Sequence, residues 1–223
     1  MSDGWVYRPP TEPWLDILYE DDDLVVINKP GGLLSVPGRV PARQDSAFVR
    51  LQARFPALRV VHRLDMDTSG LLLFACHRAA ERELDRQFRA REIGKSYRAR
   101  VWGHLAADAG IIDLPLARSR HEIRSVVDYG RGKPARTVYR TLVRHPGRWS
   151  ELDLVPQTGR SHQLRVHLLR LGHPILGDRF YAPPAACAAA PQLMLHAESL
   201  RFARPSTGEP VSIQAPLPPA WLG

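Results

Sequence analysis

Extended segments dominate this chain, and many of them follow one another with no helix between them. Alternating or continuous apolar residues predict strands at 17–19, 24–27, 58–61, 70–76, 95–102, 110–116, 123–128, 136–143, 149–155, 192–202 and 211–215. Helical periodicity is expected in three places, at 45–55, 78–92 and 158–171. This order favours an α+β fold, whose mixed and largely antiparallel central sheet has flanking helices and loops, over a doubly wound parallel sheet.

Each expected helix has a start signal, a stop signal or an apolar face. Asp45 is placed to cap the first helix and Pro56 to end it, while Gly172 fits the end of the third. The side chains expected to face the core are Phe48, Leu51, Phe55, Leu84, Phe88, Leu164, Leu168 and Leu171.

Length and composition are those of an ordinary globular domain. Hydrophobic residues make up 44% of the 223 positions and charged residues 24%. No apolar run approaches the roughly 18 residues of a membrane span, and the first twelve residues are polar, unlike a signal peptide. We therefore expect a single domain spanning residues 1–223, located in the cytoplasm.

Cysteines and histidines give no support for a metal or a disulfide framework. Cys76 and Cys187 are 111 positions apart, and neither has a partner at metal-ligand spacing. The histidines that invite a metal interpretation match no standard zinc pattern; they are His62, His162, His167 and His173. No metal and no cofactor is expected.

Positive charge is concentrated in one part of the chain. The formal net charge is +8. Residues 118–148 contain nine Arg or Lys residues and only two acids, Glu122 and Asp128, which gives a local excess of seven positive charges. The many arginines can reflect genome composition, but a cluster of one sign favours a polyanionic partner, and nucleic acid is the usual one.

The segment 62–70 carries the strongest chemical signal, with the sequence His-Arg-Leu-Asp-Met-Asp-Thr-Ser-Gly. It lies between two expected strands and places Asp65 two residues after Arg63, with small hydroxyl residues and a glycine behind it. A reactive carboxylate at the edge of a sheet needs a nearby cation to stay ionised. The alternative is a structural carboxylate that caps the turn and pairs with Arg63.

Two residues elsewhere in the chain could complete such a site. Arg165 shares its expected helix with Arg160 and His162 and is either a surface arginine or the partner of Asp65. A guanidinium held against a carboxylate stabilises the ionised form and fixes its oxygens. Tyr97, on an alternating strand, is either a core residue or a polar group that reaches the site.

Four segments resemble, in order, the motifs of the uridine-isomerising pseudouridine synthases of the RluA type. In one-letter code they are NKPGGLLSVPG at 28–38, HRLDMDTSG at 62–70, KSY at 95–97 and TGRSHQLRVHL at 158–168. The resemblance covers nearly the whole chain. It implies the pseudouridine synthase catalytic fold, which can form two subdomains around a cleft, without an S4-like RNA-binding domain.

The resemblance also implies roles for individual residues. Asp65 would be the catalytic aspartate, Tyr97 the active-site tyrosine and Arg165 the arginine that pairs with the aspartate, with Leu164 as its apolar neighbour. Arg63 would enter the space left when the target base is flipped out. Whether the carboxylate attacks C1′ or C6 of the uridine stays open.

The stretch 172–181 resembles a short, dual-specificity member of the family. It implies a monomeric isomerase that acts on uridine 32 of a tRNA anticodon stem-loop, on uridine 746 of 23S rRNA, or on both. Residues 118–127 match that member poorly, so the RNA target can differ. Side chains expected to contact RNA are Arg63, Leu164, Arg120, Arg124, Lys133, Arg136, Arg160 and His162.

Two other functions compete with this interpretation. A basic RNA-binding module without catalysis would explain the charge but not the ordered acid, tyrosine and arginine motifs. A hydrolytic nucleosidase could use the same carboxylate, but it needs a second, water-activating acid, and Asp67 is the local candidate.

Overall fold

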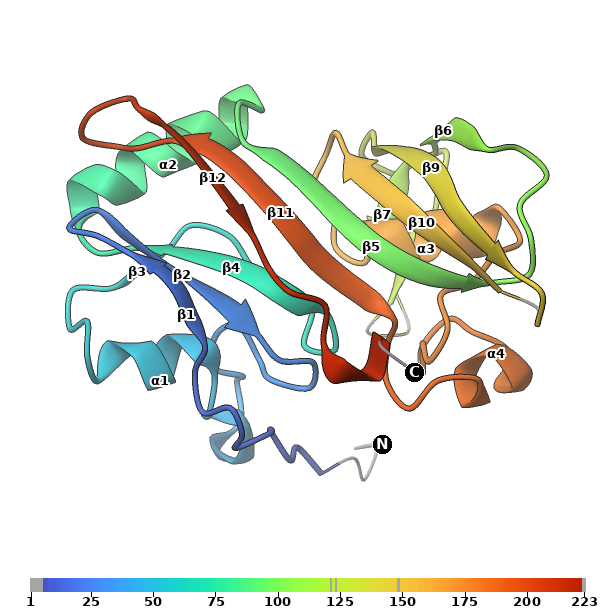
Figure 1. Ribbon diagram of the computed structural model, residues 1–223, viewed down its shortest axis with the longest axis horizontal. Coiled ribbons are helices and arrows are strands. Elements are labelled where there is room, and N and C mark those ends of the chain that lie inside the picture. Colours follow the sequence, from blue (N-terminus) through green and yellow to red (C-terminus); the bar gives the residue numbers. More distant parts are fainter. Residues whose placement is uncertain (1–5, 121, 123, 148, 222–223) are drawn as a thin grey trace. The chain divides into compact units, whose positions relative to one another are not determined.

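The computed structural model describes residues 6–120, 122, 124–147 and 149–221. The chain forms two compact units, shown in Figure 1. The first contains Met1–Ile93 and Arg201–Pro216, and the second contains Gly94–Leu200 and Leu217–Gly223. The chain therefore passes into the second unit before β5 and returns within β11.

The first unit is built on a small antiparallel sheet. Strand β1 (Ile17–Glu20) pairs with β2 (Leu24–Lys29), which pairs with β4 (Ser69–Ala75); β3 (Arg59–Val60) also pairs with β4. In the turn between β1 and β2, the Asp21 carboxylate accepts hydrogen bonds from the backbone amides of Asp23 and Leu24. All seven residues of β4 are buried, which explains the continuous apolar run that follows Ser69 and Gly70.

Two helices and a last strand complete this unit. Helix α2 (Arg78–Ala90) lies against β3 and β4, with Leu84 fully buried. The short helix α1 (Ala47–Gln52) follows a 3₁₀ turn, η1 (Pro41–Arg43). Strand β12 (Pro210–Gln214) pairs with β11 (Leu195–Ala203).

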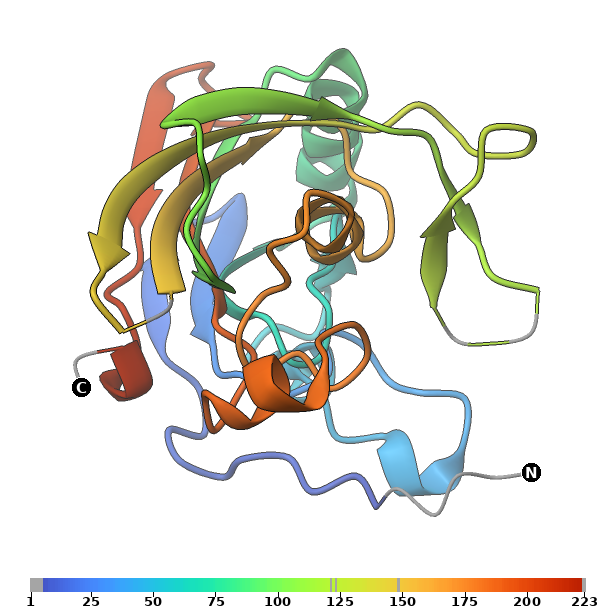
Figure 2. The same cartoon turned by 90° about the vertical axis from the view of Figure 1, so that its right-hand side faces the viewer.

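The second unit has a larger sheet in the order β5-β10-β9-β6, and β11 neighbours β5. The described pairings among β5 (Gly94–Trp102), β10 (Trp149–Pro156), β9 (Arg136–His145) and β6 (Ala109–Asp113) are antiparallel. A separate hairpin of β7 (Leu116–Arg118) and β8 (Ser125–Val127) extends away from that sheet (Figure 2).

Helix α3 (Gln163–Arg170) lies under the curved sheet of this unit, as Figure 2 shows. Its Leu164 and Leu168 pack into a core with Ala99 and Val101 of β5 and with other buried residues of the unit. A five-residue helix, α4 (Pro184–Ala188), and the 3₁₀ turn η2 (Pro219–Trp221) follow. No helix in the described ranges is long and apolar enough to cross a bilayer.

The expected α+β fold with a largely antiparallel sheet is confirmed, but several local predictions are wrong. Ser46, not Asp45, caps α1 by accepting a hydrogen bond from the Val49 amide, because Asp45 instead holds Arg50 through two hydrogen bonds of 2.8 and 2.7 Å. The expected strand 110–116 is split into β6 and β7 around Pro115, which has no N–H to donate to a ladder.

The third helix starts at Gln163, later than expected, and Leu171 lies just beyond its last residue. Leu171 is 38% exposed and is not part of the apolar stripe. Helix α4 was not predicted, since five residues are too few for helical periodicity to emerge.

Gly177 allows the chain to turn between α3 and α4, and it gives the first testable prediction. Its φ of +72° is in the left-handed region, and a Cβ there would collide with the carbonyl of Gln192. We expect Gly177→Ala to lower the free energy of unfolding by at least about 2 kcal/mol, combining backbone strain with the collision.

The measurement is urea unfolding followed by circular dichroism. Gly147→Ala is the matched control, because nothing lies within 4 Å of a Cβ at that position. Equal stabilities of the two variants would contradict the prediction.

Candidate active site

In the first unit, the backbone on both sides of Asp65 is fixed by hydrogen bonds. On one side, the buried Ser35 hydroxyl donates to the Leu64 carbonyl at 2.8 Å and accepts from the Leu64 amide at 3.1 Å. On the other side, the Met66 carbonyl accepts from the Gly32 amide at 2.9 Å. The segment that resembles the first family motif therefore anchors the segment that resembles the second.

Lys29 is the centre of this anchor. Its side chain is completely buried, and its ammonium donates to the carbonyls of Pro30, Leu33 and Met66 at 2.8, 2.8 and 2.9 Å. Three donors thus meet three acceptors, which is the arrangement that a buried ammonium requires. Sequence reasoning placed Lys29 inside a motif but gave it no role; an isolated lysine at the end of an apolar strand was the available signal.

Burial lowers the pKa of Lys29 to about 7, while the carboxylates of Asp67 and Asp65 act in the opposite direction and raise it. The negative charges of Asp67 and Asp65 therefore favour the protonated form of Lys29. Asp65 itself is half-buried, and its carbonyl accepts from the Thr68 amide at 3.2 Å.

The neighbours of Asp65 have distinct surroundings. His62 accepts a hydrogen bond from the Leu73 amide through Nε2, and its ring packs against Phe88 with centroids 5.1 Å apart. Arg63 is exposed, whereas Thr68 and Ser69 are buried. Among the residues that the structure describes, no three His, Cys, Asp or Glu side chains are grouped to hold a metal ion.

In the second unit, Arg165 is buried and oriented by Asp178. Its Nε donates to Oδ2 of Asp178 at 2.8 Å and its Nη2 to Oδ1 at 2.7 Å. The side chains are 2% and 1% exposed, so this two-point pair fixes the plane of the guanidinium in an environment poor in water. The alternative interpretation of Arg165 as a surface arginine is therefore wrong.

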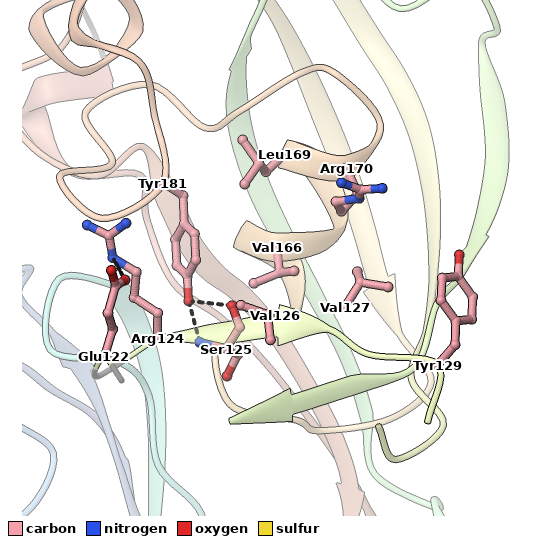
Figure 3. A pocket seen from close by; sticks show the side chains of 10 residues that line it. All are labelled: Glu122, Arg124, Ser125, Val126, Val127, Tyr129, Val166, Leu169, Arg170 and Tyr181. Atoms are coloured by element: carbon pink, nitrogen blue, oxygen red, sulfur yellow. Dashed lines mark hydrogen bonds and ion pairs between the residues drawn. The ribbon is translucent and has the colours of Figure 1, made fainter. Parts of the chain in front are cut away.

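Asp178 and Tyr181 extend this arrangement. The Asp178 carboxylate also accepts from the amides of Phe180 and Tyr181, and the Arg165 guanidinium lies 5.0 Å from the Tyr181 ring centroid. The Tyr181 hydroxyl contacts Nδ1 of His162 at 2.7 Å and accepts from the Ser125 amide at 2.8 Å, the contact drawn in Figure 3. The sequence analysis gave Asp178 no role, although the segment 172–181 that resembles the short family member contains it.

Tyr97 and Leu164 belong to the same unit as Arg165. Tyr97 is half-buried on the face of β5 that carries Ala99 and Val101, and it packs against the core that includes Leu164. Asp65, by contrast, belongs to the first unit. The expected ion pair between Asp65 and Arg165 joins residues of different units and stays a prediction.

The positive surface is less one-sided than the sequence window indicated. Acids from outside the window pair with three of its cations: Asp113 with Arg136 at 3.8 Å, Asp153 with Arg140 at 3.7 Å and Asp108 with Arg144 at 2.7 Å. Inside it, Glu122 pairs with Arg124 and Asp128 with Arg131. Arg148 lies outside the described residues.

The other expected RNA contacts differ in their surroundings. Arg120 and Lys133 are exposed, and no described acid forms an ion pair with either. Arg160 is exposed, and its Nε donates to the Pro134 carbonyl at 3.1 Å. His162 begins α3 with a left-handed backbone (φ 54°), and its imidazole is engaged by Tyr181.

Comparisons with known proteins identify the family. The family model described as RNA pseudouridylate synthase matches residues 23–170. The chain is 54% identical over 211 residues to the "Dual-specificity RNA pseudouridine synthase RluA" of Pasteurella multocida and 53% identical to that of Escherichia coli K12. Each alignment covers 94% of this chain and 96% of the relative.

Solved structures agree with this assignment. Human RNA Pseudouridylate Synthase Domain Containing 1 has a TM-score of 0.75 and 33% identity, covering 98% of this chain and 87% of that one. Human RNA Pseudouridylate Synthase Domain Containing 4 has a TM-score of 0.76 and 27% identity, covering 93% and 90%. The chain belongs to the RNA pseudouridylate synthase family. It is an enzyme that isomerises uridine in RNA.

The lowered pKa of Lys29 gives a second prediction. An unfolded lysine keeps its proton up to about 10.5, whereas the folded protein releases it near 7, so stability contributed by this group rises with pH between those values. We expect the free energy of unfolding of the wild type, minus that of Lys29→Met, to grow on the order of 2 kcal/mol between pH 7 and pH 9.

Urea unfolding of both proteins at the two pH values measures this difference. Because all other titrating groups are shared, their contributions cancel in the subtraction. A difference that stays constant with pH would mean that Lys29 keeps its proton throughout, against the prediction.

Proposed function

We propose that Asp65 is the catalytic carboxylate of this RNA uridine isomerase. The observation that carries the proposal is the anchored loop: Ser35 holds Leu64, and Lys29 and Gly32 hold Met66, so the residue between them has a defined backbone. Precise placement of a reacting group is worth several kcal/mol of activation energy. A carboxylate that attacks a sugar carbon or stabilises a cation-like C1′ has precedent in covalent catalysis.

The reaction needs only a rearrangement within one nucleotide. The N1–C1′ bond breaks, the uracil turns, C5 forms the new bond to C1′, and the proton on C5 is lost while N1 gains one. No oxidant, energy source or group donor enters this balance. Asp65 acts at C1′ or at C6.

Arg165 and Tyr97 would assist Asp65 on the same uridine. Asp178 holds the guanidinium of Arg165 in one plane, which suits it to aim a carboxylate and keep it ionised. Tyr97 would stack on the uracil or accept a proton, and Leu164 would give an apolar contact. In this proposal the two units act together as one catalytic domain.

The substrates proposed are a tRNA anticodon stem-loop and 23S rRNA, with uridines 32 and 746 as targets. Relatives more than 50% identical over nearly the whole chain carry the name of a dual-specificity enzyme. The target base would be flipped out of its loop, which costs a few kcal/mol, and the exposed Arg63 would stack in the vacated space. We also propose that the enzyme works as a monomer in the cytoplasm.

Removing the carboxylate tests the proposed role of Asp65. We expect Asp65→Asn to lower pseudouridine formation in a stem-loop RNA at least about 10³-fold, because the amide is a poor nucleophile and carries no charge. RNA affinity should stay within about threefold of the wild type. Pseudouridine is measured by mass spectrometry of RNA digests, which also detects free uracil.

Asp85→Asn is the control, since it removes another half-buried carboxylate of the same unit. Near wild-type product formation by Asp65→Asn would reject the assignment. Release of free uracil by the wild type would instead favour hydrolysis.

Arg120 and Lys133, which pair with no acid in the described part of the second unit, lead to a prediction about salt. Each phosphate neutralised on single-stranded RNA contributes about −0.7 to the slope of log K against log salt. For the double variant Arg120→Ala with Lys133→Ala, we expect that slope to become shallower by about 1.4.

Fluorescence anisotropy with a labelled stem-loop, measured over a range of KCl concentrations, gives the slope. Arg140→Ala is the matched control, because Asp153 already pairs with that arginine. A double variant with the wild-type slope would remove Arg120 and Lys133 from the RNA-binding surface.

A further inference from the structure

A pocket of about 360 Å³ lies between strand β8 and helix α3, entirely within the second unit (Figure 3). Its walls are apolar: α3 contributes Val166 and Leu169, and the facing strand contributes Val126 and Val127. Tyr181 and Tyr129 lie at opposite ends of this opening in Figure 3. An apolar slot with an aromatic ring at each end suits an unpaired nucleobase, because single-stranded bases stack on aromatic side chains.

Tyr129 is exposed to solvent. It is 77% exposed, more than any other large hydrophobic residue in the described part of the chain. The turn beneath it is fixed, since the Asp128 carboxylate accepts from the amides of Gly130 and Arg131 and pairs with the Arg131 guanidinium at 2.6 Å. A large ring held in water on a rigid turn beside an apolar slot is suited to stacking on a ligand.

The charged residues that line the pocket favour an anionic ligand. Glu122 and Arg124 both line the pocket and pair with each other at 3.2 Å, so their charges offset. Arg170 also lines it, and no described acid forms an ion pair with this exposed residue. The positive excess at an otherwise apolar slot fits a base linked to a phosphate better than an apolar peptide.

We propose that this pocket binds one unpaired base of the RNA substrate, a base other than the target uridine, with Tyr129 stacking on it and Arg170 contacting its phosphate. This rests on the proposed function. The pocket shares a wall with the proposed catalytic machinery, because the Tyr181 ring that closes one end lies 5.0 Å from the Arg165 guanidinium. A second base bound there would fix the register of the RNA loop relative to Arg165.

The experiment compares Tyr129→Ala with Tyr129→Phe. Stem-loop RNAs, each lacking the base of a single loop nucleotide but keeping the target uridine, are the probes. We expect Tyr129→Ala to weaken binding of the intact stem-loop about tenfold, which corresponds to the loss of one stacked base. Tyr129→Phe keeps the ring and should bind like the wild type.

One abasic position should weaken wild-type binding by a similar factor and cause no further loss in Tyr129→Ala. That non-additivity identifies the base that occupies the pocket. Ile111→Ala, which removes another exposed apolar side chain of this unit outside the pocket, is the control for general surface effects.

Wild-type affinity of Tyr129→Ala, or additive losses at every abasic position, would overturn the proposal. The proposal would also be overturned if the wild type were a dimer and Tyr129→Ala a monomer with unchanged RNA affinity. The pocket would then bind a second copy of the chain and not RNA. If Asp65→Asn still abolishes product, these results reject the pocket proposal and leave the proposed function intact. If the wild type forms no pseudouridine, the proposed function is rejected, and the binding measurements still test whether the pocket holds a base.

Discussion

The buried ammonium of Lys29 is the constraint around which the candidate site of the first unit is organised. A charge without water is tolerated only where hydrogen bonds replace its hydration, and here three carbonyls do so. Two of them belong to the segment directly after β2, and the third belongs to Met66, 37 residues after Lys29. Satisfying one ammonium therefore fixes two loops together, and the second of these loops presents Asp65. Any rearrangement of this loop would leave a buried donor or acceptor unpaired, which opposes motion more strongly than apolar contacts alone.

In the second unit the buried charge that must be stabilised is negative. Asp178 is 1% exposed and receives two bonds from Arg165 and two from backbone amides, so the carboxylate and the guanidinium satisfy each other. Gly177 lets the chain place Asp178 there, since its left-handed backbone leaves no room for a side chain beside Gln192. Loss of either charged partner would strand the other in an environment poor in water. In both units a polar group that orders the backbone lies next to the residue proposed for catalysis.

The sequence alone predicted the sheet-dominated fold and most strand positions, because continuous or alternating apolar residues are a direct imprint of burial. Buried polar contacts were not accessible in the same way. Asp45 and Ser46 are both good helix caps, and the choice depended on Arg50, which takes the carboxylate of Asp45. Leu171 continued a leucine spacing but lies beyond the end of α3. The roles of Lys29 and Asp178 required knowing which carbonyls and amides surround them, and local patterns do not encode such long-range contacts. Counting charges within one window overstated the local positive excess for a related reason, since the acids that pair with three of its arginines, Asp108, Asp113 and Asp153, lie outside the window.

These contrasts divide the enzyme into a rigid part and an adaptable one. Asp65 and Arg165, which are proposed for chemistry, are held by buried neighbours whose hydrogen bonds are satisfied and which tolerate little change. Groups proposed to select RNA, such as Tyr129 and Arg120, are exposed and contribute little to packing. The hairpin of β7 and β8 includes much of segment 118–127, which is expected from the sequence to match the short family member poorly. Substitutions on such a surface cost little stability. If the hairpin contacts RNA as expected, its substitution would change the choice of RNA loop while the isomerisation chemistry stays the same.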